Sequence, residues 1–293
     1  MVLKSIRSRQ RHIKGRLMGG LGFCTSWAVD VAGKGREWIE IIELDLDVPN
    51  LPAGFQGKRI IHISDLHCSR TVSAKYLSHC IDRINELDGD IVVLTGDYIT
   101  HDISGRFRKK AVDIVARLKS RHGVFASLGN HDYGIEVMSE LSREKSLRGM
   151  IKNFERKGVN VLRNNSCQIN LAGSSLRIVG LGDIWAGDLN AEKAFAGVAA
   201  DEAVIVLSHN PDSIGHLDGY DAGVVMSGHT HGKGLQFSIK RGFSGINKLS
   251  YPGGLYEVAG KKLYVNRGLG RLGRALFNAR PEITVFKLRS RAI

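Results

Sequence analysis

Two short stretches of this sequence each place two potential metal ligands two residues apart. They are Ser64-Asp65-Leu66-His67 and Gly228-His229-Thr230-His231-Gly232. Carboxylate oxygens and imidazole nitrogens both bind divalent cations. Each stretch follows an apolar run that predicts a strand, at 60–63 and at 223–226. Because side chains two apart lie on the same side of extended backbone, we expect both pairs to point into one site at strand ends.

Other residues of the same types follow other predicted strands. In chain order the candidates at strand ends are Asp65, His67, Asp97, Asn130, His131, His209, His229 and His231. A lone histidine after a strand is usually structural, and a Gly-Asp pair is usually a turn. Five separate motifs at the ends of five predicted strands instead favour one shared metal site.

The elements that must position these residues alternate along the chain. The predicted strands are 38–48, 59–64, 90–95, 123–127, 160–163, 167–171, 176–181, 203–207, 223–226, 256–258, 262–266 and 283–288, and the predicted helices are 76–87, 107–121, 140–157 and 191–199. The first strand alternates apolar and acidic residues, which indicates an edge strand. The last three strands have a hairpin-like pattern. Repetition of strand, motif and helix predicts a layered α/β domain whose chemistry lies in loops at strand ends.

Composition and charge suit a globular protein with basic ends. The chain has 293 residues, of which 43% are hydrophobic, and a formal net charge of +13. Residues 1–36 hold eight Lys or Arg against one acid, and residues 261–293 hold nine against one. Such ends can meet an anionic lipid surface or nucleic acid. We expect a basic tail at 1–36 and one domain at 37–293.

The tail and the cysteines bear on location. The apolar part of the tail is too short and too rich in glycine to span a membrane. Its near-helical spacing favours a segment on a membrane surface. The alternatives are a loosely packed tail and a secretory signal, for which the basic start fits but a convincing cleavage site is missing. Cys24, Cys68, Cys80 and Cys167 are far apart, which favours reduced thiols. These features predict a cytoplasmic protein, peripheral on the inner face of the cytoplasmic membrane if the tail binds lipid.

As an ordered set, the motifs resemble those of the calcineurin-like metallophosphoesterases, whose pattern is D-x-H, G-D, G-N-H-D/E, H and G-H-x-H. They stand here as Asp65-Leu66-His67, Gly96-Asp97, Gly129-Asn130-His131-Asp132, His209 and Gly228-His229-Thr230-His231. The resemblance covers about residues 37–293. It implies a four-layer α/β/β/α sandwich with two metals at the strand ends.

The resemblance also implies how the candidate residues divide the work. It assigns Asp65, His67 and His231 to one metal, Asn130, His209 and His229 to the other, and Asp97 to a bridge between them. A carboxylate suits the bridge because its two oxygens neutralise two cations about 3.5–4 Å apart. Such a pair lowers the pKa of a shared water, so that hydroxide exists near neutral pH. Manganese fits this mixture of ligands, and iron, magnesium, zinc and cobalt remain alternatives.

His131 has a different place in the family pattern, beside the metals. There it would donate a hydrogen bond or a proton to the phosphate or to the leaving oxygen. Family members often orient this histidine with an acid, and both Asp132 and Asp102 are candidates for that role.

Three further stretches resemble one bacterial, membrane-associated branch of the family. They are 51–60, 265–270 and 280–283. That branch includes phosphodiesterases and a type of UDP-2,3-diacylglucosamine pyrophosphatase of lipid A synthesis. Its G-H-T-H-G-G-Q is replaced here by G-H-T-H-G-K-G at 228–234, which departs from the pattern only after the metal residues. A lipid-linked phosphoester or pyrophosphate is therefore the first substrate hypothesis.

Other functions follow in order. A small soluble phosphodiester or monoester is second. A nuclease is disfavoured because aromatic residues make up only 7% of the chain and none of its stretches interleaves them with basic residues. A non-catalytic scaffold ranks last because every predicted ligand is present.

Two features could contact the substrate. Arg267, Arg271 and Arg274 lie in a glycine-rich loop after a predicted strand, where guanidinium groups could clamp a second phosphate. The alternative is a solvated basic loop. Trp185 could line the site or belong to the core.

Overall fold

The computed structural model describes residues 39–134, 139–232, 235–240, 243–248, 251–270 and 280–290. The predicted tail at 1–36, which includes Cys24, lies outside these residues, as do Arg271 and Arg274. The strands are β1 (Glu40–Val48), β2 (Arg59–Ile63), β3 (Ile91–Thr95), β4 (Val124–Ser127), β5 (Val159–Val161), β6 (Asn165–Leu171), β7 (Ser174–Gly180), β8 (Val204–Leu207), β9 (Val224–Ser227), β10 (Leu235–Lys240), β11 (Phe243–Lys248), β12 (Gly254–Val258), β13 (Lys261–Val265) and β14 (Glu282–Ser290). The helices are α2 (Ala74–Glu86), α3 (Arg106–Val115), α4 (Asn130–Tyr133), α5 (Glu140–Glu155) and α6 (Ala191–Ala194), with 3₁₀ turns η1 (Ala53–Phe55) and η2 (Pro211–His216).

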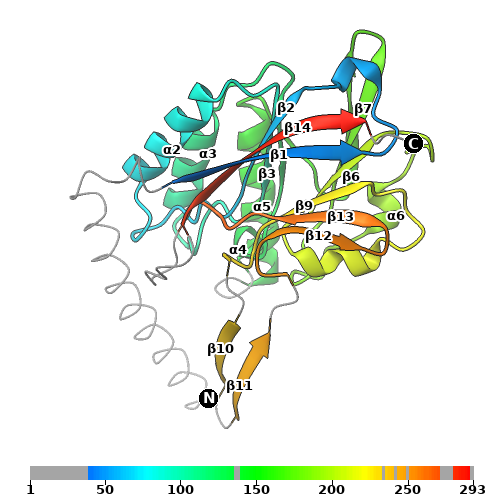
Figure 1. Cartoon of the computed structure of the whole chain (residues 1–293). Coiled ribbons are helices and arrows are strands. Elements are labelled where there is room, and N and C mark those ends of the chain that lie inside the picture. Colours follow the sequence, from blue (N-terminus) through cyan, green and yellow to red (C-terminus); the bar gives the residue numbers. More distant parts are fainter. Residues whose placement is uncertain are drawn as a thin grey trace, which may run out of the picture.

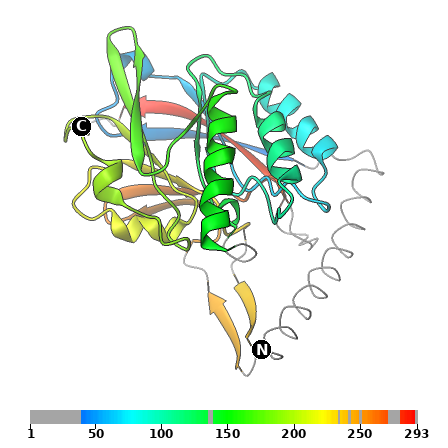
Figure 2. The same ribbon diagram turned by 180° about the vertical axis from the view of Figure 1, so that it is seen from behind.

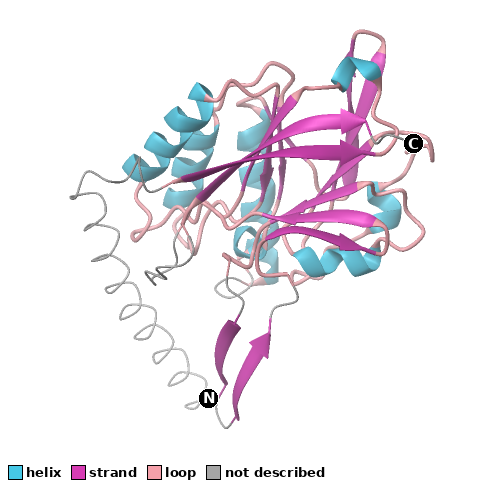
Figure 3. Ribbon diagram, viewed as in Figure 1, coloured by secondary structure: helices cyan, strands magenta, loops and turns pink. Residues whose placement is uncertain are grey.

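Two six-stranded sheets form the centre of the fold (Figure 1). The first has the order β1-β14-β2-β3-β4-β5, and the second has the order β12-β13-β9-β8-β7-β6. Apolar residues on alternate faces explain why the sheets stack. In β3, Val92 and Leu94 pack toward the helices, whereas Ile91 and Val93 pack between the sheets. The predicted four-layer α/β/β/α sandwich is confirmed, and Figure 3 shows helices outside both sheets.

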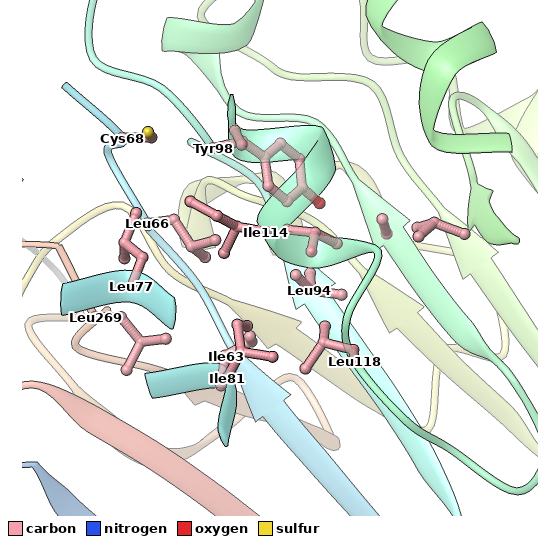
Figure 4. Close-up of a cluster of buried hydrophobic side chains, with 14 of the residues drawn as sticks. Ile63, Leu66, Cys68, Leu77, Ile81, Leu94, Tyr98, Ile114, Leu118 and Leu269 are labelled. Atoms are coloured by element: carbon pink, nitrogen blue, oxygen red, sulfur yellow. The ribbon is translucent and has the colours of Figure 1, made fainter. Parts of the chain in front are cut away.

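Helices α2, α3 and α5 cover the first sheet through a buried cluster. In α2 the buried residues are Leu77, Cys80, Ile81 and Ile84, which recur at the spacing of one helix face. Figure 4 shows Ile81 beside Ile63 of β2, and Leu77 near Leu66 in the same cluster. On the second sheet, α6 and η2 pack against β8 and β9 through a smaller cluster. Both sheets are therefore held between helical layers.

The strand directions bring five strand ends together. In the first sheet β2, β3 and β4 are parallel neighbours, and in the second β8 and β9 are parallel neighbours. Parallel strands end at the same edge of a sheet, and β3 of one sheet contacts β8 of the other. The loops that carry the candidate metal residues therefore leave the sandwich at one place.

The structure departs from the predicted elements in several places. Strand β14 does not extend the hairpin β12–β13 but crosses to the first sheet, between β1 and β2. Helices α3 and α6 are shorter than predicted, and residues 130–133, predicted as loop, form α4. A further hairpin, β10–β11, follows the motif at 228–232 and projects from the sandwich in Figure 2. Among the described helices, none has the length and apolar character needed to cross a membrane.

Candidate metal centre

Five of the candidate residues have left-handed backbone conformations. Asp65, His67, Asp97, His229 and His231 have φ angles between 49° and 74°. The extended backbone predicted for the two i, i+2 pairs is therefore wrong, because β2 and β9 end before these residues begin. Non-glycine residues rarely adopt this region. Each such conformation costs about 1–3 kcal/mol and persists only where the surrounding structure imposes it. Tight loops, rather than extended strands, turn these side chains toward one another.

Two glycines allow the loops to approach this closely. A Cβ atom on Gly129 would collide with Asp97, and one on Gly228 would collide with the carboxylate of Asp65 and the hydroxyl of Ser64. Glycine is required at both positions because backbone passes directly against a candidate ligand.

Asp65, His67 and His231 form one group whose ligand atoms converge. The Nε2 atoms of His67 and His231 are 3.1 Å apart, and Oδ1 of Asp65 lies 3.3 Å from Nε2 of His231. The same Oδ1 lies 3.6 Å from Nε2 of His67. Two imidazole nitrogens and a carboxylate oxygen directed at a common point are the arrangement that a divalent cation requires.

Asp97, His209 and His229 form a second group on the other side of the site. Nε2 of His209 lies 3.2 Å from Oδ2 of Asp97 and 3.2 Å from Nδ1 of His229. Nδ1 of His209 is 2.7 Å from the carbonyl oxygen of Thr95, to which it donates, so its Nε2 is the nitrogen that faces the group. Metal-binding histidines are commonly oriented in this way through their second nitrogen.

Asn130 is a further candidate oxygen ligand for the second group. Its side chain is buried, and its Oδ1 has no hydrogen-bond partner among the described residues. A buried amide oxygen without a donor is costly, and a metal ion is one way to satisfy it. Asn130 follows Gly129, which lies against both Asp97 and His209.

Asp97 lies between the two groups. Its Oδ2 is 3.2 Å from His209 Nε2, 3.5 Å from His67 Nε2 and 4.0 Å from His131 Nε2. Its Oδ1 accepts a hydrogen bond of 3.0 Å from the backbone N–H of His131. This is the position from which one carboxylate can bridge two cations.

The charges of the site favour an ionised Asp97 and a neutral His229. At His209, burial would lower the pKa, but the Asp97 carboxylate outweighs it and raises that pKa above its ordinary value. Burial would raise the pKa of Asp97, but His209 and the other nearby imidazoles outweigh it and hold that pKa below its ordinary value. Burial, and then the neighbouring His209, lower the pKa of His229 to about 4. Both states are those that bind a metal ion. The donor set therefore fits divalent cations in chemistry as well as in geometry.

His131 is oriented by a backbone carbonyl and not by an acid. Its Nδ1 lies 2.7 Å from the carbonyl oxygen of Thr100, and its Nε2 faces the site. The two predicted acids have other partners. Asp102 accepts a hydrogen bond from the backbone N–H of Arg108. Asp132 accepts from the backbone N–H groups of three residues in the site loops, Asp97, Tyr98 and Gly129.

We expect the substitution Asp132→Asn to destabilise the protein by about 2–3 kcal/mol. Burial, and then the nearby Asp97 carboxylate, raise the pKa of Asp132 to about 7, while the backbone N–H groups favour its charged form. An asparagine has one acceptor oxygen, so its NH₂ group would face a backbone N–H. Urea unfolding measures the difference, with Asp102→Asn as the matched control because Asp102 receives a single backbone N–H among the described contacts. Equal stability of the two variants would contradict this role for Asp132.

Arg267 and Trp185 are the remaining predicted site residues that the structure describes. Nη2 of Arg267 binds Oε2 of Glu40 at 2.8 Å, and Nε of Arg267 binds Glu282. A clamp on a second phosphate would require one of these carboxylates to release it. Trp185 is exposed, and its ring lies against that of His229. The sequence left open whether Trp185 lines the site or belongs to the core. Its side chain lies outside the core, although an aromatic residue near a strand end is more often buried there.

Comparisons with known proteins agree with this geometry. The family described as calcineurin-like phosphoesterase matches residues 58–233. The chain is 29% identical to UDP-2,3-diacylglucosamine pyrophosphatase LpxG of Chlamydia trachomatis serovar D, over 85% of this chain and 89% of that protein. It is 30% identical to the metallophosphoesterase YkuE of Bacillus subtilis, over 97% of this chain and 98% of that protein. It is also 30% identical to the phosphodiesterase YaeI of Escherichia coli, over 78% and 82% respectively.

Proposed function

The chain belongs to the calcineurin-like phosphoesterase family and is a hydrolase that acts on phosphoesters, and from that premise we propose a two-metal enzyme with a lipid-linked nucleotide substrate. UDP-2,3-diacylglucosamine is the specific candidate, cleaved at its pyrophosphate to release UMP. The position of Asp97, whose Oδ2 faces His209 and His67 from two groups of ligands, is the observation that supports the two-metal site.

The side chains divide into those that hold cations and one that handles a proton. In this proposal Asp65, His67 and His231 hold one cation, Asn130, His209 and His229 hold the other, and Asp97 holds both. Bound there, two divalent cations, with manganese the preferred pair, would polarise phosphoryl oxygens and lower the pKa of water. The protein contributes ligand atoms fixed by burial and by hydrogen bonds such as that from His209 to Thr95.

His131 is the proposed proton donor to the leaving oxygen. Because its Nδ1–H donates to Thr100, Nε2 is the nitrogen that gains and releases a proton. The side chain is 17% exposed, whereas Asp97 is 2% exposed, so substrate can reach His131 more readily than the Asp97 carboxylate. A neutral carbonyl fixes the ring without adding a negative charge behind it.

Similarity and charge together support a lipid-linked substrate. The similarity to the Chlamydia pyrophosphatase covers most of both chains, and that protein is named for this substrate. The basic ends of this chain suit anionic lipid head groups. A broad phosphodiesterase acting on small soluble substrates is the second candidate, supported by the similarity to YaeI.

We expect release of UMP when the purified chain is incubated with Mn²⁺ and UDP-2,3-diacylglucosamine in detergent micelles. The His131→Ala variant serves as the control and is expected to release UMP at least 100-fold more slowly. Chromatography of the products measures both rates. Rapid cleavage of bis(p-nitrophenyl) phosphate with no release of UMP would retain the hydrolase and reject the lipid-linked substrate.

A further inference from the structure

Trp185 is an exposed aromatic side chain in contact with a candidate metal ligand. It is 56% exposed, and its ring centroid lies 4.3 Å from that of His229, with the two planes at 88°. An edge-to-face contact of this kind covers one edge or one face of the indole. More than half of the Trp185 side chain therefore remains accessible to a ligand beside the second metal group.

The loop that carries Trp185 is fixed by one buried side chain. Oδ1 of Asn164 accepts hydrogen bonds from the backbone N–H groups of Gly182 and Asn190, at 2.8 and 3.0 Å. Its Nδ2 donates to the carbonyl oxygen of Asp188 at 2.5 Å. Within the loop, Oδ1 of Asp183 accepts from the backbone N–H of Ala186 at 2.9 Å. The backbone of this loop is therefore already ordered, so binding of a ligand at Trp185 would not incur the entropy cost of ordering the loop.

The same loop is tied to the helix that carries His131. Asp188 accepts a hydrogen bond of 2.7 Å from the hydroxyl of Tyr133, which lies in α4 two residues after His131. Arg163 binds both oxygens of Asp188, at 2.8 and 3.0 Å. The loop that carries Trp185 is thus tied to the helix that carries His131, and the ring of Trp185 contacts that of His229.

Single exposed apolar residues are common and usually need no explanation. Trp185 differs because its loop is rigid and because it contacts a residue of the metal centre. We propose that Trp185 is a substrate-binding residue that stacks on a nucleobase, so that the site accepts a nucleoside phosphate. This inference rests on the proposed function, since it names the part of the substrate that the protein recognises beside the scissile phosphate. A flat, open indole suits a planar ring better than a flexible acyl chain.

The test compares UMP with ribose 5-phosphate, which has the same phosphate and sugar and no base. Isothermal titration calorimetry on the Mn²⁺-loaded full chain measures both dissociation constants. We expect the wild-type protein to bind UMP about tenfold more tightly than ribose 5-phosphate. Trp185→Leu is expected to abolish that preference, and Trp185→Phe, which keeps a flat ring, to retain most of it. Metal content measured on each variant shows whether His229 is undisturbed.

Three other outcomes overturn the inference. A wild-type protein without preference for UMP has no nucleobase subsite. A Trp185→Leu variant that keeps the preference recognises the base elsewhere, or uses Trp185 only as an apolar surface. A variant that loses metal, or binds both ligands equally less well, reveals a structural role. If the preference depends on Trp185 but UDP-2,3-diacylglucosamine is not cleaved, the subsite stands and the lipid-linked substrate fails.

Discussion

Replacing His131 with alanine is expected to lower kcat by about 10²–10⁴-fold while leaving the bound metal unchanged. The imidazole is the group that protonates the leaving oxygen in the proposed mechanism. Its Nε2 lies 4.0 Å from Oδ2 of Asp97, farther than the 3.2 Å of His209. The backbone N–H of His131, which donates to Asp97, survives the substitution. The bridging carboxylate therefore keeps its position in the variant.

Metal analysis decides between two roles for His131. Its ligand atom also lies close enough to those of His67 and Asp97 to form a third possible metal group. Loss of a metal ion from His131→Ala would show that it is a ligand and would contradict the proposed proton transfer. His101→Ala is the matched control, since the exposed His101 ring lies 5.2 Å from that of His131. This control is expected to lose less than tenfold in kcat, because it retains the carbonyl of Thr100.

The sequence pattern was sufficient to predict a layered α/β domain and the strand ends that carry the site residues, and the resemblance to a family added the four-layer sandwich. Runs such as 91–95 are buried on both faces, and a nearly continuous apolar run of this kind can be recognised from the side chains alone. Asp65, His67 and His231 could be placed together because their types and order resemble a family pattern. The ends of β2, β3, β4, β8 and β9 meet because these strands are parallel within each sheet and the two sheets are in contact. No single motif carries that information.

Features of the backbone could not be predicted in the same way. The positive φ angles of Asp65 and His229 are imposed by tertiary contacts, and residue type signals them only weakly, because Asp and His are enriched in this region without being specific to it. The orienting group of His131 is a carbonyl, which every residue has, so a search among acids could not find it. Strand β14 joins the first sheet through pairing with β1, a contact between the two ends of the domain. Gly129 and Gly228 stand directly beside candidate ligands and mark places where backbone passes close to them. An interpretation based only on the spacing of the ligands did not use this signal.

The substitution Asp97→Asn is expected to remove both metal ions and to abolish detectable hydrolysis. The carboxylate is buried, and it is the group whose oxygens face ligands of both metal groups. Asparagine has nearly the same shape and can still accept the hydrogen bond from the backbone of His131. It lacks the negative charge that brings two divalent cations close together. The loss therefore tests charge and bridging rather than packing.

Asp65→Asn is the comparison that separates a bridge from a terminal ligand. The Asp65 carboxylate belongs to one metal group, in which its Oδ1 lies 3.3 Å from His231. This variant is expected to retain one metal ion per chain, whereas Asp97→Asn retains none, by elemental analysis after gel filtration. Mn²⁺ should correspondingly raise the melting temperature of the wild type and of Asp65→Asn, but not that of Asp97→Asn, because only a bound ion stabilises the native state. If both variants lose a single ion, Asp97 serves one cation, and the two groups of histidines work without a shared carboxylate.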